Sequence, residues 1–226
     1  MHRSRSPAAA IRIPGDELKW MSQKAWQRWR DGSRPVLGTL LGVLSVAGTV
    51  TYGVPALRSS VLAVGAVRAA LPWCVECARL PASAFLPTPG LPLPLAVAQI
   101  VVVVGLAEML LGRWATLGVA AAGQIVSTVT ARLLLGLTTL HAIGLSASQA
   151  HVLDTGPSAV TTAVGAWLLV RFRAHRCVVL LGAALVVADA VQNDLDGREH
   201  LVAFCCGVLI GICRPGRFGS ARARTG

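Results

Sequence analysis

The stretch VLGTLLGVLSVAGTVTYGVPAL, residues 36–57, decides the fold class because no charged residue interrupts it. An apolar helix of ~20 residues crosses the ~30 Å hydrocarbon core of a bilayer, so this stretch predicts a transmembrane helix. The rest of the chain has the same character: 54% of its 226 residues are hydrophobic, 14% are charged, and the mean hydropathy is +0.63. This composition predicts an all-α, polytopic membrane protein.

Five more apolar segments follow, so six spans are predicted in total. The five segments are Leu91–Leu111, Trp114–Leu137, Gly156–Val170, Cys177–Gln192 and His200–Cys213. The last three are short for a span, and their support comes from charge. With a cytoplasmic N-terminus and six crossings, sixteen of the 21 Lys and Arg residues lie inside and four lie outside. Cytoplasmic loops carry such an excess of positive charge, so both termini are predicted to be cytoplasmic.

The predicted organisation has three parts. Residues 1–35 form a basic, Trp-rich cytoplasmic arm, in which residues 16–30 follow helical spacing and predict an interfacial anchor helix. Residues 36–213 form the six-helix membrane domain, with a long loop at about 58–90 in or on the outer leaflet. Residues 214–226 form a basic cytoplasmic tail. The first apolar run begins at residue 36 and is too long for a cleaved signal peptide.

The net charge of +11 raises the question of a nucleic-acid partner. The positive residues flank the apolar segments instead of alternating with aromatic residues on a soluble face, so the lipid bilayer is the predicted partner and nucleic acid is not. Two lysines against nineteen arginines, with a single asparagine, are typical of a GC-rich bacterial genome. The predicted location is therefore the bacterial plasma membrane.

Cys74 and Cys77 form a single CVEC pair in the predicted outer loop. No second CxxC and no nearby histidine completes a four-ligand zinc set. We interpret the two thiols as incidental or disulfide-linked in preference to metal-binding.

Five polar residues fall inside predicted spans, where such groups are costly and often functional. They are Gln99, Glu108, Gln124, Arg132 and Asp189. One hypothesis is a small transporter or channel, which would need Gln99, Glu108, Arg132 and Asp189 to line one water-filled path. The simpler interpretation is that Glu108 and Arg132 lie near span ends and make helix-to-helix hydrogen bonds or a buried pair.

The segment GPSA, residues 156–159, places a hydroxyl at a helix start. With Pro157 at the first helical position, Ser158 lies in the first turn, where main-chain N–H groups lack partners and the dipole favours negative charge. A hydroxyl there can act as a nucleophile, with its own N–H donating to the oxyanion. Of the five histidines, His200 alone heads a predicted span on the same side, so it is the candidate base. The alternative is a helix-start hydroxyl and an interfacial histidine.

These segments resemble motifs of the rhomboid intramembrane proteases. HLVAFCCGVLIG, residues 200–211, looks like the last core helix of that family, with Phe204, Gly207 and Gly211 following the histidine. GPSA resembles the GxSG nucleophile motif, EMLLG (108–112) resembles ExxxG, and RLPASAFL (79–86) resembles the stretch that leads out of the first loop. The resemblance covers most of residues 36–214 and implies a six-helix rhomboid-like bundle.

By this resemblance the chain would be an intramembrane serine protease. Ser158 would attack the scissile carbonyl, His200 would act as general base and then acid, and Gly156 and Ala159 would support the oxyanion. The helix-packing residues would be Glu108, Gly112, Phe204, Gly207 and Gly211. The substrate would be a transmembrane helix of another protein, and neither a metal nor an organic cofactor is implied.

Two features depart from the family pattern. Its proteases carry HxxxN in the second core helix, and the corresponding places here fall near Pro92 and Ala96; the final glycine of GxSG is Ala159. Loss of one oxyanion donor costs roughly 10²–10³ in rate, which still allows a slower protease. A rhomboid pseudoprotease that binds membrane clients without cutting them is the second hypothesis, and the transporter is the third.

Overall fold

The computed structural model describes residues 14–68, 70–86, 92–137, 147–153 and 155–213. Every regular element in these ranges is a helix, which confirms the all-α class. Residues 1–13 of the predicted arm and the whole predicted tail, 214–226, lie outside the described residues.

The first half of the chain contains two helices of 17 and 18 residues, two loop helices of 11 residues each and a further long helix. These are α1 (Pro14–Arg30), α2 (Val36–Gly53), α3 (Pro55–Gly65), α4 (Trp73–Ser83), and a continuous helix made of α5 (Leu93–Gln99), the π-helical turn η1 (Ile100–Val104) and α6 (Gly105–Leu111). The second half contains α7 (Arg113–Gly136), the 3-10 turn η2 (Ala147–His151), α8 (Ser158–Arg171), α9 (His175–Gln192) and α10 (Leu195–Cys213).

Four helices in the described part are long and apolar enough to cross a membrane, which indicates a membrane protein. They are Val36–Gly53, Leu93–Leu111, Arg113–Leu135 and His175–Gln192. Each coincides with a predicted span. The other two predicted spans are helices of different character: α8 has only 14 residues, and α10 begins with a charged turn. The first span is shorter than predicted because Pro55, which has no N–H to donate, begins a new helix.

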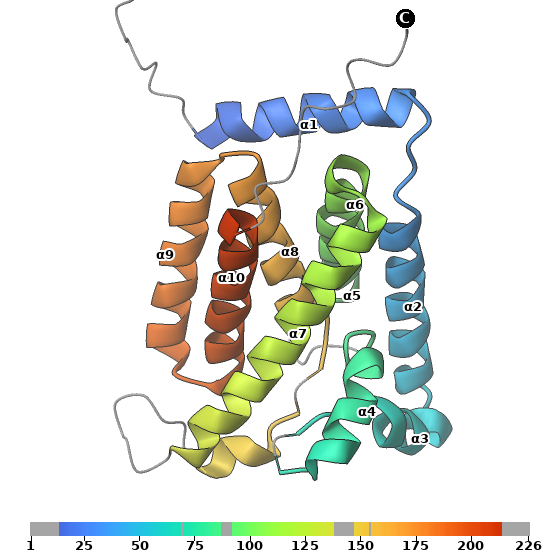
Figure 1. The fold of residues 1–226 in the computed structure, drawn as a ribbon. Coiled ribbons are helices and arrows are strands. Elements are labelled where there is room, and N and C mark those ends of the chain that lie inside the picture. Colours follow the sequence, from blue (N-terminus) through green and yellow to red (C-terminus); the bar gives the residue numbers. More distant parts are fainter. Residues whose placement is uncertain (1–13, 69, 87–91, 138–146, 154, 214–226) are drawn as a thin grey trace, which may run out of the picture.

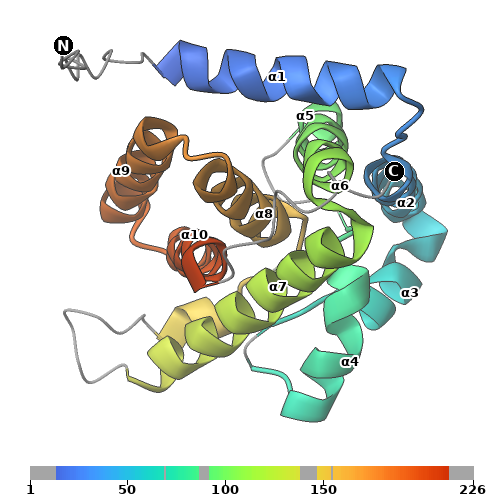
Figure 2. The same ribbon diagram turned by 45° about the horizontal axis from the view of Figure 1, so that its top comes forward.

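α8 lies at the centre of the bundle, between α7, α9, α10 and the α5–α6 helix (Figures 1 and 2). Most of its residues are buried, and Ala163 and Val164 have no exposed surface. Along the chain, α9 connects α8 to α10, with a short connection at each of its ends. Because each connection reverses the direction of the chain, α8 and α10 run in the same direction. α8 begins further inside the bundle than α10 does (Figure 1).

The two ends of the bundle are covered differently. α1 lies across one end, with Met21 and Ala25 buried in the core and its three tryptophans exposed (Figure 1). This confirms the helix predicted in residues 16–30. α3 and α4 lie at the opposite end, so the loop predicted at 58–90 contains two helices (Figure 1).

Backbone contact between α8 and α10 depends on Gly207. A Cβ atom at Gly207 would lie 2.1 Å from the carbonyl oxygen of Ala163. Small residues allow transmembrane helices to approach closely, and the gain comes from van der Waals packing. Gly118 on α7 is the opposite case, because a Cβ there would meet nothing within 4 Å.

The substitutions Gly207→Ala and Gly118→Ala are expected to change stability in opposite directions. Gly207→Ala pushes α8 and α10 apart and should destabilise the protein by about 1–3 kcal/mol. The added methyl group of Gly118→Ala meets no neighbouring atom, so this substitution should stabilise the protein by roughly 0.5–1 kcal/mol through helix propensity. Thermal unfolding in detergent micelles measures both. Equal gains in the two variants would contradict the close α8–α10 contact.

Candidate active site

Ser158 is the first residue of α8, and Gly156 turns the chain into that helix. The φ angle of Gly156 is +114°, a conformation that glycine adopts readily and other residues rarely do. The prediction that Pro157 is the first helical residue is wrong by one position. Its carbonyl oxygen accepts the first helical hydrogen bond, from the Thr161 N–H at 2.8 Å, so Pro157 is the N-cap. The N–H of Ser158 therefore has no acceptor within the helix.

The start of α8 is attached to α4 by one main-chain hydrogen bond. The Gly156 N–H donates to the Ser83 carbonyl oxygen at 2.9 Å, so this N–H is occupied. The N–H groups of Ser158 and Ala159 are the oxyanion donors that the helix start can offer. The places that correspond to HxxxN hold an exposed Pro92 and a buried Ala96, and neither side chain can donate a hydrogen bond.

His200 is held in one orientation by the first turn of its own helix. Its Nδ1 lies 2.7 Å from the Asp196 carbonyl oxygen. A carbonyl oxygen only accepts, so in the neutral ring the proton belongs on Nδ1 and the lone pair on Nε2. A general base needs this tautomer to take a proton from a serine hydroxyl. The Asp196 carboxylate, 3.6 Å from Nδ1, adds a negative charge beside the ring.

Ser158 and His200 lie at similar depth on neighbouring helices. Ser158 precedes Ala163 by five residues, and His200 precedes Gly207 by seven. Since Ala163 and Gly207 are in contact, a rise of ~1.5 Å per residue leaves a height difference of about 3 Å. Within the described part of the chain no hydrogen bond joins the Ser158 hydroxyl to His200. Catalytic hydrogen bonds are often long before substrate binds, so this arrangement is compatible with a dyad.

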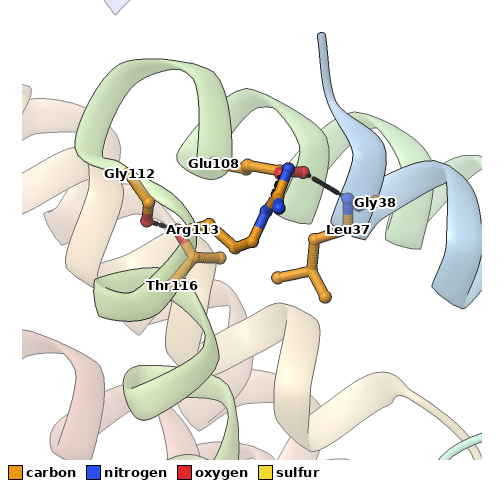
Figure 3. Close-up of polar contacts among 6 residues, drawn as sticks. All are labelled: Leu37, Gly38, Glu108, Gly112, Arg113 and Thr116. Atoms are coloured by element: carbon orange, nitrogen blue, oxygen red, sulfur yellow. Dashed lines mark hydrogen bonds and ion pairs between the residues drawn. The ribbon is translucent and has the colours of Figure 1, made fainter.

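Glu108 is the centre of a group of polar contacts that joins α6 to the starts of α2 and α7 (Figure 3). Its Oε2 accepts from the N–H groups of Leu37 and Gly38 at 2.6 and 3.2 Å, and its Oε1 pairs with Arg113 Nε at 3.0 Å. Leu37 and Gly38 are in the first turn of α2, where N–H groups lack helical acceptors. The carboxylate therefore caps α2 and complements its dipole. Gly112, with a φ of +97°, ends α6 and begins α7.

The remaining motif residues lie at helix contacts. The Phe204 ring packs on α9, where a Cβ at Gly182 would lie 3.0 Å from its Cζ. Gly211 faces Val170 on α8, at a hypothetical Cβ distance of 2.7 Å. Ala159, the last residue of GPSA, and Ala203, on the α10 turn after His200, are both buried.

The intramembrane polar residues are divided among separate contacts. Arg132 and Glu108 do not pair with each other, because the Arg132 guanidinium pairs with Glu76 on α4 and also donates to the Leu71 carbonyl oxygen. Asp189 lies 3.1 Å from Arg198, at an angle unsuited to a hydrogen bond. Gln124 lines a cavity between α4 and α7 that the other four do not line. This distribution gives the transporter hypothesis no common path.

Both cysteines of the CVEC pair are free thiols, exposed on α4. The disulfide alternative is absent from this structure. Among the residues that the structure describes, no group of three or more His, Cys, Asp or Glu is placed to hold a metal ion.

Three contributors to the site were not identified from the sequence. Asp196 orients His200 through its carbonyl oxygen. The only indication of this contact in the sequence is that the two residues are four apart on one helix. Ser83 holds Gly156 through a main-chain atom, which leaves no trace in residue type. Glu76 is the charged residue of the CVEC segment. Its partner Arg132 lies 56 residues further along the chain, so nothing near Glu76 in the sequence predicts the pair.

Comparisons with known proteins leave the family assignment open. No protein-family model matches the chain, and a search of curated proteins found no match. The class that the fold itself defines is a helical membrane protein with a buried central helix that begins with serine.

Proposed function

We propose that the chain is a rhomboid-like intramembrane serine protease that cleaves transmembrane helices of other proteins through Ser158 and His200. The observation that carries the proposal is the hydrogen bond from His200 Nδ1 to the Asp196 carbonyl oxygen, 2.7 Å long. This hydrogen bond leaves Nε2 of His200 as the atom that can accept a proton. Ser158 begins the parallel helix α8 at a similar depth in the bundle.

The proposed reaction follows from these positions. Ser158 Oγ attacks the carbonyl carbon of a peptide bond while His200 Nε2 takes its proton, and the N–H groups of Ser158 and Ala159 receive the oxyanion. His200 then returns the proton to the leaving amine, and water hydrolyses the acyl-enzyme by the same route. The substrate helix has to unwind near the site, because carbonyls in a helix are already hydrogen-bonded.

The proposed membrane arrangement has six crossings in a bacterial plasma membrane, with both termini cytoplasmic. Two observations support it. α8 and α10 are packed within the bundle although they are not counted among the four long apolar helices. The basic side chains gather on α1 and in 171–176, at the end of the bundle that the charge rule assigns to the cytoplasm.

The second candidate is a pseudoprotease that binds transmembrane clients without cutting them. It is favoured by the lack of donors at Pro92 and Ala96 and by the occupation of the Gly156 N–H by Ser83. Only main-chain donors at the start of α8 then remain for the oxyanion.

A fluorophosphonate probe separates the two candidates, because it reacts only with an activated serine. We expect the purified protein to be labelled at Ser158, located by peptide mass spectrometry. His200→Ala should slow labelling by roughly 10²-fold or more, which is the usual contribution of a general base. The matched control is Ser60→Ala, an exposed serine on α3, which should label at the native rate. A folded native protein that shows no labelling would favour the pseudoprotease.

A further inference from the structure

A cavity lies between α4 and α7, beside the start of α8. Its volume is about 400 Å³, within the range of small-molecule sites. Its walls are almost entirely apolar and include exposed residues such as Leu117 and Ile125 on α7. Pro157 lies at one edge, but neither Ser158 nor His200 lines it. α7 is long and apolar enough to span a membrane, so the exposed apolar residues of this wall are suited to contact with hydrocarbon.

Two buried polar side chains in the wall of the cavity each hold an oxygen atom that has no hydrogen-bond partner. Gln124 is 7% exposed and Thr128 is 3% exposed, and they lie one turn apart on α7. Gln124 Oε1 and Thr128 Oγ1 are both unbonded, which is costly in an apolar surrounding. Both residues line the cavity and both oxygens are buried, so a rotation of the Gln124 amide is needed to turn Oε1 toward the cavity.

The polar groups of the cavity select for a neutral hydrogen-bond donor. Gln124 Oε1 and the Glu76 carboxylate can only accept, and the Thr128 hydroxyl can accept as well. The charge of Glu76 is already balanced by Arg132, so a ligand ammonium would be buried without a free counter-charge. A hydroxyl meets the requirement, whereas an ester or ether oxygen offers no proton.

We propose that this cavity binds a lipid alcohol, an apolar chain that carries one hydroxyl, which enters from the membrane between α4 and α7. The chain fills the apolar space, and the hydroxyl donates to Gln124 Oε1 while it accepts from Thr128. The proposal does not rest on the proposed peptidase activity, and neither Ser158 nor His200 lines the cavity.

Photolabelling in lipid nanodiscs tests the proposal with two probes: a long-chain alkanol with a mid-chain diazirine, and its methyl ether with the same diazirine. We expect the alkanol to label the facing segments of α4 and α7 about fivefold more than the ether, the size of one net hydrogen bond. Equal labelling by the two probes would overturn the proposal. So would alkanol labelling of α4 and α7 no stronger than that of the exposed α9 residues Val187 and Val191.

Two variants and their controls locate the effect. Gln124→Leu with Thr128→Val should abolish the preference for the alkanol, whereas Thr130→Val, on α7 outside the cavity, should keep it. Ala121→Trp should fill the cavity and suppress labelling, and Ala115→Trp, exposed on α7 away from the cavity, should not. Each variant is compared with the native protein by thermal unfolding, so a loss of labelling through misfolding is recognised.

Discussion

Ser158→Ala and His200→Ala are each expected to reduce cleavage of a transmembrane reporter by roughly 10³-fold or more, to the level of protein-free vesicles. Removing the hydroxyl removes the nucleophile. Removing the imidazole leaves a hydroxyl that is hardly ionised near neutral pH and has no neighbouring acceptor for its proton. Because the two groups act in one step, the double variant should be no slower than either single variant.

The assay uses the full chain in vesicles with a reporter helix labelled at both ends, so that cutting separates two fluorophores. The matched controls are Ser60→Ala and His151→Ala, which alter an exposed serine and an exposed histidine outside the site. Both should cleave at the native rate. Native activity that persists in Ser158→Ala would reject the dyad, and no cutting by the folded native protein would favour the pseudoprotease.

Arg132→Ala is expected to produce the largest loss of stability, about 3 kcal/mol. Its guanidinium pairs with Glu76, which is 1% exposed, and stacks 4.4 Å from the Trp73 ring centroid. Removing one partner of a buried pair leaves the other charge buried and unpaired, which costs ~3–5 kcal/mol. We take the lower end because about one-fifth of the Arg132 side chain is exposed. Glu76→Gln in the Arg132→Ala background should restore part of the loss.

Arg113→Ala is the matched control for this prediction. Arg113 also pairs with a buried glutamate, Glu108, but half of its own side chain is exposed. Glu108 keeps two main-chain hydrogen bonds without it, so the expected loss is below about 1 kcal/mol. Unfolding in mixed micelles measures both variants. Equal losses would contradict this prediction, because they would show that burial of the glutamate alone sets the cost.

The asymmetry between these two pairs is also relevant to the candidate site. Glu76 and Arg132 connect α4 to α7, and α4 holds the loop before Ser158 through the Ser83 carbonyl oxygen. We therefore expect Arg132→Ala to lower reporter cleavage as well as stability, while Arg113→Ala leaves cleavage close to native.

The sequence alone determined the helical class and the approximate extent of most helices. Apolar segments of sufficient length, bounded by Pro and Gly, are local signals, since a helix satisfies its main-chain hydrogen bonds within one segment. Pro55 shows the limit of this approach, because the apolar stretch 36–57 continues through it while the helix ends at Gly53. The sequence also located a serine at the start of α8 and a histidine near the start of α10.

Only the tertiary structure decided which polar groups meet. Glu108 and Arg132 both bond between helices, which was one of the two alternatives, but the sequence did not show their partners: Glu108 caps α2, and Arg132 pairs with Glu76 on α4. Such partners are set by the rotation and depth of each helix relative to its neighbours. Those quantities depend on contacts such as Gly207 with Ala163, where two main chains touch. Residue type and spacing along one helix carry no information about them, because partner choice is a property of the packed bundle.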